Sequence, residues 1–170
     1  MESIVNENLD VLLSVAEVSV AFAGFAGIIT AVVSNNLAGW DPGNASRFRL
    51  MIFSSLSAIV ASLMPYAFLL NSGQIDWVWN IAMLGVYLLG FTVYNIRSFV
   101  LARHDLNGYV SFVVSILGTS ATLVQFAALI GMVTPSLGVY FLGVFYLLIQ
   151  SCIAFTRLVT QAILKPDKTG

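Results

Sequence analysis

Five apolar runs, each long enough to cross a lipid bilayer, dominate this 170-residue chain. They cover roughly residues 10–34, 48–70, 77–101, 109–133 and 138–164, and a membrane-spanning helix needs about 20 residues. Backbone groups inside hydrocarbon must be satisfied within the segment, and these runs are too long and too uniformly apolar for barrel strands. With 59% hydrophobic and 9% charged residues, the chain is predicted to be an all-α integral membrane protein. We expect a bundle of five transmembrane helices that forms a single transmembrane domain over residues 1–170.

Basic residues lie at alternate connections between the apolar runs. They are Arg47, Arg49, Arg97, Arg103, Arg157, Lys165 and Lys168. The tail before the first run and the connections at 71–76 and 134–137 contain none. Because cytoplasmic loops are enriched in Lys and Arg, we expect the N-terminus outside and the C-terminus in the cytoplasm. Arg97 and Arg157 then provide charge at the cytoplasmic boundary, where they are expected to contact lipid headgroups.

The segment AEVSVAFAGFAG, residues 16–27, places one acid among alanines and glycines inside the first run. On a helix that turns by about 100° per residue, small side chains gather on one side. This small face consists of Ala16, Ser19, Ala23, Gly24, Gly27 and Ala31, with Gly24 toward the flank where Glu17 lies. The larger side chains on the other side are Val11, Val15, Val18, Phe22, Phe25 and Ile29. Membrane helices approach closely over small residues, so the small face is predicted to pack and the bulky face to meet lipid or a loosely fitted neighbour.

Glu17 carries a carboxyl group inside an apolar span, where a charged group has a high free-energy cost. It follows Asp10 by seven residues, which puts it about 10 Å further along the helix and in the outer third of the membrane. A charged acid in hydrocarbon costs about 2.5–3.5 kcal/mol even on the lenient insertion scales. Three hypotheses for Glu17 stay open: a proton or cation site on a permeation pathway, a neutral hydrogen-bonded strut, and a contact with a partner membrane protein.

Other polar side chains are expected at similar depths in the remaining runs. Gln125 and Tyr146 should share the outer third with Glu17, and Tyr87 should lie somewhat deeper, so these side chains are predicted to meet around the carboxyl group. Gln150 brings a second complete amide into the bilayer. The predicted pathway or intramembrane polar cluster is therefore Glu17, Gln125, Gln150, Tyr87 and Tyr146.

Pro65 interrupts the hydrogen bonding of the second run. A proline has no N–H, so it frees the carbonyl group of Ala61, four residues earlier. Such a carbonyl group is usually satisfied by a neighbouring Ser or a water, and sometimes serves as a ligand for an ion.

The residues that membrane enzymes use are missing. His104 is the one histidine and lies in a connection, and Cys152 is the one cysteine. This excludes a haem-ligating His pair and an H-E-x-x-H metalloprotease motif. We expect no enzymatic activity, no metal and no cofactor.

The chain has no internal repeat, so the symmetry of a symmetric pathway would have to come from more than one copy. We therefore expect a homo-oligomer that provides a channel-like or transport route for an ion or small polar solute, with Glu17 at or near the route. The alternative is a non-transporting accessory or scaffold subunit that docks on a partner membrane complex through the Ala/Gly face. The segment at residues 16–27 resembles segments near the start of small bacterial membrane proteins, which favours the bacterial inner (plasma) membrane. The lipid bilayer is the expected environment, and no nucleic-acid partner is expected.

Overall fold

The computed structural model of the protein describes residues 2–33, 42–101 and 108–164, all of which lie in helices or the short turns that join them. Five helices follow one another: α1 (Glu2–Val33), α2 (Pro42–Ser72), α3 (Trp77–Leu101), α4 (Gly108–Leu129) and α5 (Leu137–Leu164). Each contains a stretch that is long and apolar enough to cross a membrane. The all-helical fold with five long apolar helices is thus confirmed. His104 lies outside the described residues.

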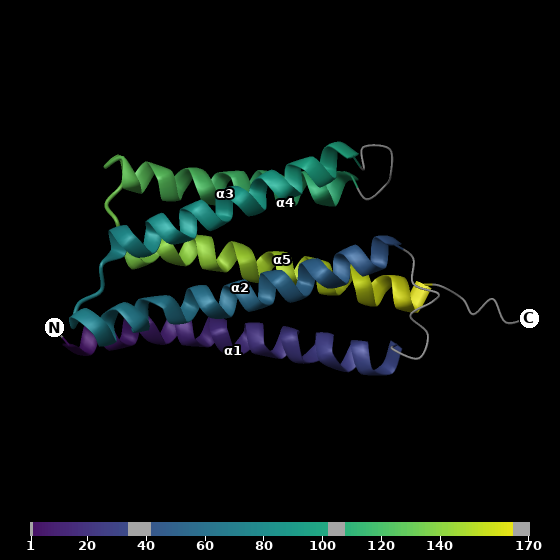
Figure 1. Ribbon diagram of the computed structural model, residues 1–170, viewed down its shortest axis with the longest axis horizontal. Coiled ribbons are helices and arrows are strands. Elements are labelled where there is room, and N and C mark those ends of the chain that lie inside the picture. Colours follow the sequence, from purple (N-terminus) through teal and green to yellow (C-terminus); the bar gives the residue numbers. More distant parts are fainter. Residues whose placement is uncertain (1, 34–41, 102–107, 165–170) are drawn as a thin grey trace, which may run out of the picture.

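Helix α5 occupies the middle of the bundle. It contacts all four other helices, with the α1–α2 hairpin on one side and the α3–α4 hairpin on the other. Figure 1 shows this order, with α1 at one edge and α3 and α4 at the opposite edge. Between the described residues, α1 contacts α2 and α5 but neither α3 nor α4. The placement of α1 at an edge decides the surroundings of Glu17.

The helix ends carry specific capping interactions. The carboxyl group of Asp76 accepts hydrogen bonds from the backbone N–H groups of Val78 and Trp79, at 3.0 and 3.2 Å, and so caps the start of α3. Helix α4 ends at Leu129, four residues before the predicted 133. Gly131 is the cause, because its φ of +79° lies in the left-handed region that ends helices.

The first two helices differ from the expected spans by extending further. Helix α1 begins at Glu2, where the sequence predicted about residue 10, and α2 begins at Pro42 in place of 48. The apolar part of α1 is the 20-residue stretch Leu9–Ile28. The acidic residues at the start of α1 therefore continue the helix beyond the apolar stretch and do not form an unstructured tail.

Two of the buried hydroxyl groups on α2, those of Ser54 and Ser55, are satisfied at short range, whereas Ser62 Oγ has no hydrogen-bond partner among the described residues. Ser54 Oγ donates to the carbonyl oxygen of Leu50 at 2.7 Å, and Ser55 Oγ donates to that of Met51 at 2.8 Å. Ser55 Oγ also lies 2.6 Å from Ser151 Oγ on α5. These contacts join α2 to α5 and leave Ser54 and Ser55 without a need for water.

Tyr140 satisfies the carbonyl group that Pro65 frees. Its hydroxyl group, fully buried on α5, donates a hydrogen bond of 2.6 Å to the carbonyl oxygen of Ala61. The expectation from the sequence was a nearby Ser or a water. A side chain 79 positions away along the chain takes that role, because α5 packs directly against α2.

Candidate functional site

Glu17 lies on the outer side of α1, exposed at the surface of the bundle. It is the ninth residue of the 20-residue apolar stretch Leu9–Ile28, close to the middle. None of the described residues donates a hydrogen bond to its carboxyl group or forms an ion pair with it. A charged side chain has its largest transfer cost at the centre of a span, and none of the described residues offsets that cost at Glu17.

The predicted meeting of Glu17 with Gln125, Tyr87 and Tyr146 does not occur within the chain. Helix α1 makes no contact with α3 or α4, which carry Tyr87 and Gln125. The interior side of α1 is formed by residues such as Leu12 and Ser19, both fully buried, and Glu17 lies on the opposite side.

A stripe of exposed residues continues from Glu17 along α1. The stripe consists of Asp10, Ser14, Glu17, Ala21, Gly24 and Ile28, all exposed and spaced by alternating steps of four and three residues. Alternating steps of four and three keep residues on one helix face and suit a left-handed helix–helix contact. We call this set the exposed stripe of α1.

The predicted packing face of α1 divides between the interior and the surface of the chain. Ala16 and Ser19 are buried and Ala23 is half-buried, whereas Gly24 and Gly27 are exposed. A Cβ atom added at Gly24 or Gly27 would meet nothing within 4 Å. The surroundings of Ala31 lie outside the described residues. The two glycines therefore provide no close approach inside this chain.

Large side chains of α1 that were assigned to lipid or a loose neighbour partly face the interior. Val15 is 6% exposed. The rings of Phe22 and Phe25 each lie 5.6 Å, between centroids, from the ring of Phe155 on α5. Aromatic contacts at this distance are favourable, so α1 turns its Phe22 and Val15 side toward α5 and its Glu17 side outward.

Gln150 and Tyr146 do come together, in the interior between α3 and α5. Gln150 Nε2 donates to Asn95 Oδ1 at 3.1 Å, and Asn95 Nδ2 lies 3.4 Å from the Tyr146 hydroxyl group. Thr92 and Thr122 hydroxyl groups, 3.2 Å apart, join α3 to α4 nearby. This cluster is buried among helices and does not include Glu17.

Asn95 is not among the residues that the sequence predicted for the polar cluster, which took Tyr87 from α3. Tyr87 is exposed, whereas Asn95 is buried. The signal that identifies Asn95 is the apolar series Ile81, Leu84 and Leu88, all buried, whose face Asn95 continues.

Gln125 occupies a separate buried position in the same half of the bundle. Its Nε2 donates a 2.6 Å hydrogen bond to the carbonyl oxygen of Val139 at the start of α5. Gly85 on α3 and Gly143 on α5 leave the room it needs, since a Cβ at Gly143 would lie 2.9 Å from Nε2. The Oε1 atoms of Gln125 and Gln150 have no hydrogen-bond partner among the described residues, so each can accept a hydrogen bond from a small donor such as water.

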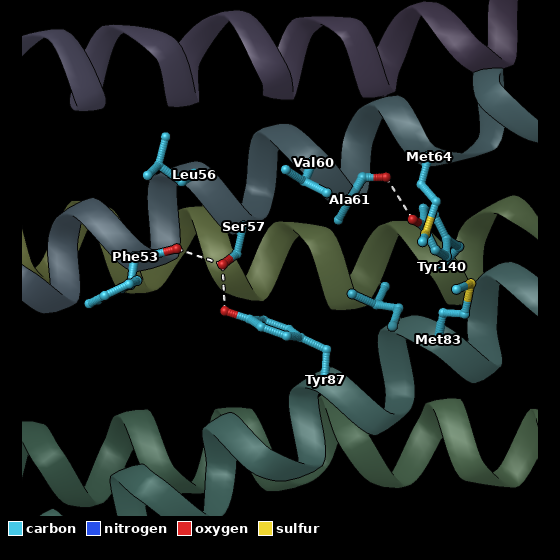
Figure 2. A pocket seen from close by; sticks show the side chains of 10 residues that line it. Phe53, Leu56, Ser57, Val60, Ala61, Met64, Met83, Tyr87 and Tyr140 are labelled. Carbon is cyan, nitrogen blue, oxygen red and sulfur yellow. Dashed lines mark hydrogen bonds between the residues drawn. The ribbon is translucent and has the colours of Figure 1, made fainter.

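Tyr87 lines a cavity that opens at the surface of the bundle between α2 and α3. Its hydroxyl group contacts that of Ser57 on α2 (Figure 2).

Arg97 is exposed and Arg157 half-buried, and both lie at the end of the bundle opposite the start of α1. Cys152 is half-buried on α5. Within the described parts of the chain, no three His, Cys, Asp or Glu residues group as a metal site would require.

Comparisons with protein-family models, with curated proteins and with solved structures find no match to this chain. The functional inference therefore depends on the geometry of the five spans and on the polar groups that they carry.

Proposed function

We propose that this five-span membrane protein assembles with copies of itself through the exposed stripe of α1, and that the assembly provides a route for an ion or small polar solute past Glu17. The observation that carries the proposal is the outward position of the Glu17 carboxyl group near the middle of its span. In a lone chain this group would face hydrocarbon, at a cost of about 2.5–3.5 kcal/mol when charged. Contact with another copy, or water in a route between copies, removes that cost.

The exposed stripe suits contact with another helix. Its steps of four and three residues form one face, and Ala21 and Gly24 leave the backbone accessible to a close neighbour. Ser14 Oγ donates a hydrogen bond of 3.0 Å to the carbonyl oxygen of Asp10, so its hydroxyl donor is already satisfied within α1 and needs no partner from a second helix. A symmetric ring of copies would place each Glu17 near the shared axis or next to the neighbouring chain.

A carboxyl group at this depth favours a proton or a cation as the permeant species. The basic residues Arg47, Arg97 and Arg157 all lie at the opposite end of the bundle from the start of α1, so none of them can neutralise Glu17 at mid-span. If that end faces the cytoplasm, as the positive-inside rule favours, the route leads inward from the acidic start of α1. The proposed role is binding and passage, without an enzymatic step.

Glu17→Gln tests the route directly. In liposomes that contain the purified full-length protein, we expect a proton or cation flux that is lost in Glu17→Gln, because the neutral amide offers a proton or cation no carboxylate to bind. Glu17→Asp is the matched control, since it keeps a carboxyl group and is expected to keep the flux. A wild-type protein with no flux, or a flux that Glu17→Gln leaves unchanged, would show that the route is not there.

Gly24→Leu tests the interface separately from the route. Gly24 is exposed and a Cβ atom there would meet nothing within 4 Å, so we expect the leucine to leave the fold unaffected but to block close approach of a second helix along the stripe. We expect a shift from oligomer to monomer in mass photometry or sedimentation of the detergent-solubilised protein. Gly90→Leu is the control, because Gly90 is also exposed with nothing within 4 Å but lies on α3, away from the stripe. Identical oligomeric states for the two variants would contradict an interface at the stripe.

The same surface suits a docking role, since the open glycines of α1 would also receive a helix of another protein. A protein with that role would be monomeric and inert in liposomes, and its stripe would hold a different membrane protein during purification. That combination would favour the accessory subunit over the homo-oligomeric route.

A further inference from the structure

A cavity of about 280 Å³ opens between α2 and α3, where the two helices diverge over α5. Its walls come from both helices and its floor includes Tyr140 of α5, as Figure 2 shows. Along α2 it runs from Phe53 to Met64, a rise of about 16 Å at 1.5 Å per residue. The cavity is therefore elongated along α2, within the apolar spans of α2 and α3.

The polar atoms of the cavity are already satisfied. The Ser57 hydroxyl group contacts that of Tyr87 and donates to the carbonyl oxygen of Phe53 at 2.6 Å. The Tyr140 hydroxyl group donates to the carbonyl oxygen of Ala61 at 2.6 Å. The remaining lining is aliphatic, aromatic or methionine. A cavity with this lining gives water few partners and favours an apolar occupant.

We propose that this cavity binds one acyl chain of a membrane lipid. Its rim is formed by side chains exposed on the membrane side, such as Phe53 and Val60, which are 62% and 65% exposed. In a bilayer, lipid tails would lie directly against these exposed apolar side chains. Met64 and Met83, from opposite walls, have flexible side chains that adapt to an occupant of variable shape.

The outline and lining of the cavity suit an acyl chain. The cavity runs along α2 from Phe53 to Met64, and apart from the satisfied Ser57, Tyr87 and Tyr140 hydroxyl groups its lining side chains are apolar. The inference does not depend on the proposed route, because the cavity lies between α2 and α3 and none of its lining residues is on α1.

Photolabelling with a phospholipid tests the proposal. The full-length protein is placed in liposomes containing a phospholipid with a diazirine at the middle of one acyl chain, and the adducts are mapped by mass spectrometry after irradiation. We expect the adducts to concentrate on the walls of the cavity, at Met64, Met83 and Tyr87. Met83→Trp fills the cavity from α3 and should remove most of this labelling. Leu123→Trp makes the same kind of change at an exposed position on α4, outside the cavity, and should leave it unchanged.

Two results would overturn the proposal. One is labelling spread over the exposed apolar side chains of all helices in proportion to their exposure, which indicates lipid contact without a site. The other is labelling of the cavity walls that Met83→Trp does not reduce. If size-exclusion chromatography shows that Met83→Trp fails to fold, Val60→Trp fills the cavity from the α2 wall and is subject to the same two criteria.

Discussion

Gly118→Ala is expected to lower the free energy of unfolding by about 1–3 kcal/mol, the usual range for overpacking a filled interior. A Cβ atom at Gly118 would lie 2.5 Å from the hydroxyl oxygen of Tyr146 and 2.8 Å from its Cζ atom. Tyr146 is 4% exposed, so its ring has little room to move aside. The hydroxyl oxygen of Thr92 would lie 3.1 Å from the same Cβ atom, so a second side chain also crowds the added methyl group.

The expected loss of stability is opposite in sign to the usual effect of replacing a helical glycine by alanine. Alanine is a better helix former than glycine by about 1 kcal/mol, so a helical glycine with free space around it should gain stability on the same change. Gly90→Ala, at an exposed position of α3 with nothing within 4 Å, is the matched control and is expected to be neutral or stabilising. Both variants are compared with the wild type by thermal unfolding in detergent. Equal stabilities for the two variants would show that the Gly118–Tyr146 contact is not a tight one.

Tyr140→Phe is expected to lower the free energy of unfolding by about 1–3 kcal/mol, the cost of leaving a buried acceptor without a donor. The tyrosine hydroxyl group, fully buried, is the donor to the carbonyl oxygen of Ala61, which Pro65 deprives of its backbone donor. The phenylalanine ring fills the same space, so the packing around α5 should be preserved. The measurement is the unfolding midpoint in a denaturant series in detergent micelles.

A double-mutant cycle separates the hydrogen bond from other effects of the substitution. Pro65→Ala restores a backbone N–H that can donate to Ala61, so Tyr140→Phe should cost less in the Pro65→Ala background than in the wild type. We expect a coupling energy of about 1 kcal/mol between the two positions. Additive effects of the two substitutions would show that Tyr140 stabilises the bundle through packing and not through this carbonyl group.

The helices themselves could be predicted because apolar length is a local property. Each span needs about 20 apolar residues whatever its neighbours are, and all five predicted runs correspond to helices. The helix ends were less predictable. Local backbone geometry at Gly131 ended α4 early, and α1 continued past its apolar stretch to Glu2, since polar residues can extend a helix beyond the membrane.

The candidate site could be predicted only in part. Gln125 and Tyr146 were predicted to belong to an intramembrane polar cluster around Glu17, and both are buried in the bundle, but the expected contact with Glu17 requires α1 to adjoin α3 and α4. Depth along a helix follows from counting residues. Adjacency and rotation do not, because in a membrane every apolar face is compatible with both lipid and another helix.

The sequence alone determined that this chain is a five-helix membrane protein, that an acid lies within its first span, and that Pro65 frees the Ala61 carbonyl group. The tertiary structure decided which groups meet these features: Tyr140 reaches Ala61 because α5 is central, and Glu17 faces outward because α1 turns Phe22 toward Phe155. The physical reason is that spans and freed carbonyl groups depend on residues close in sequence, whereas partners depend on how five helices pack, which no single helix specifies.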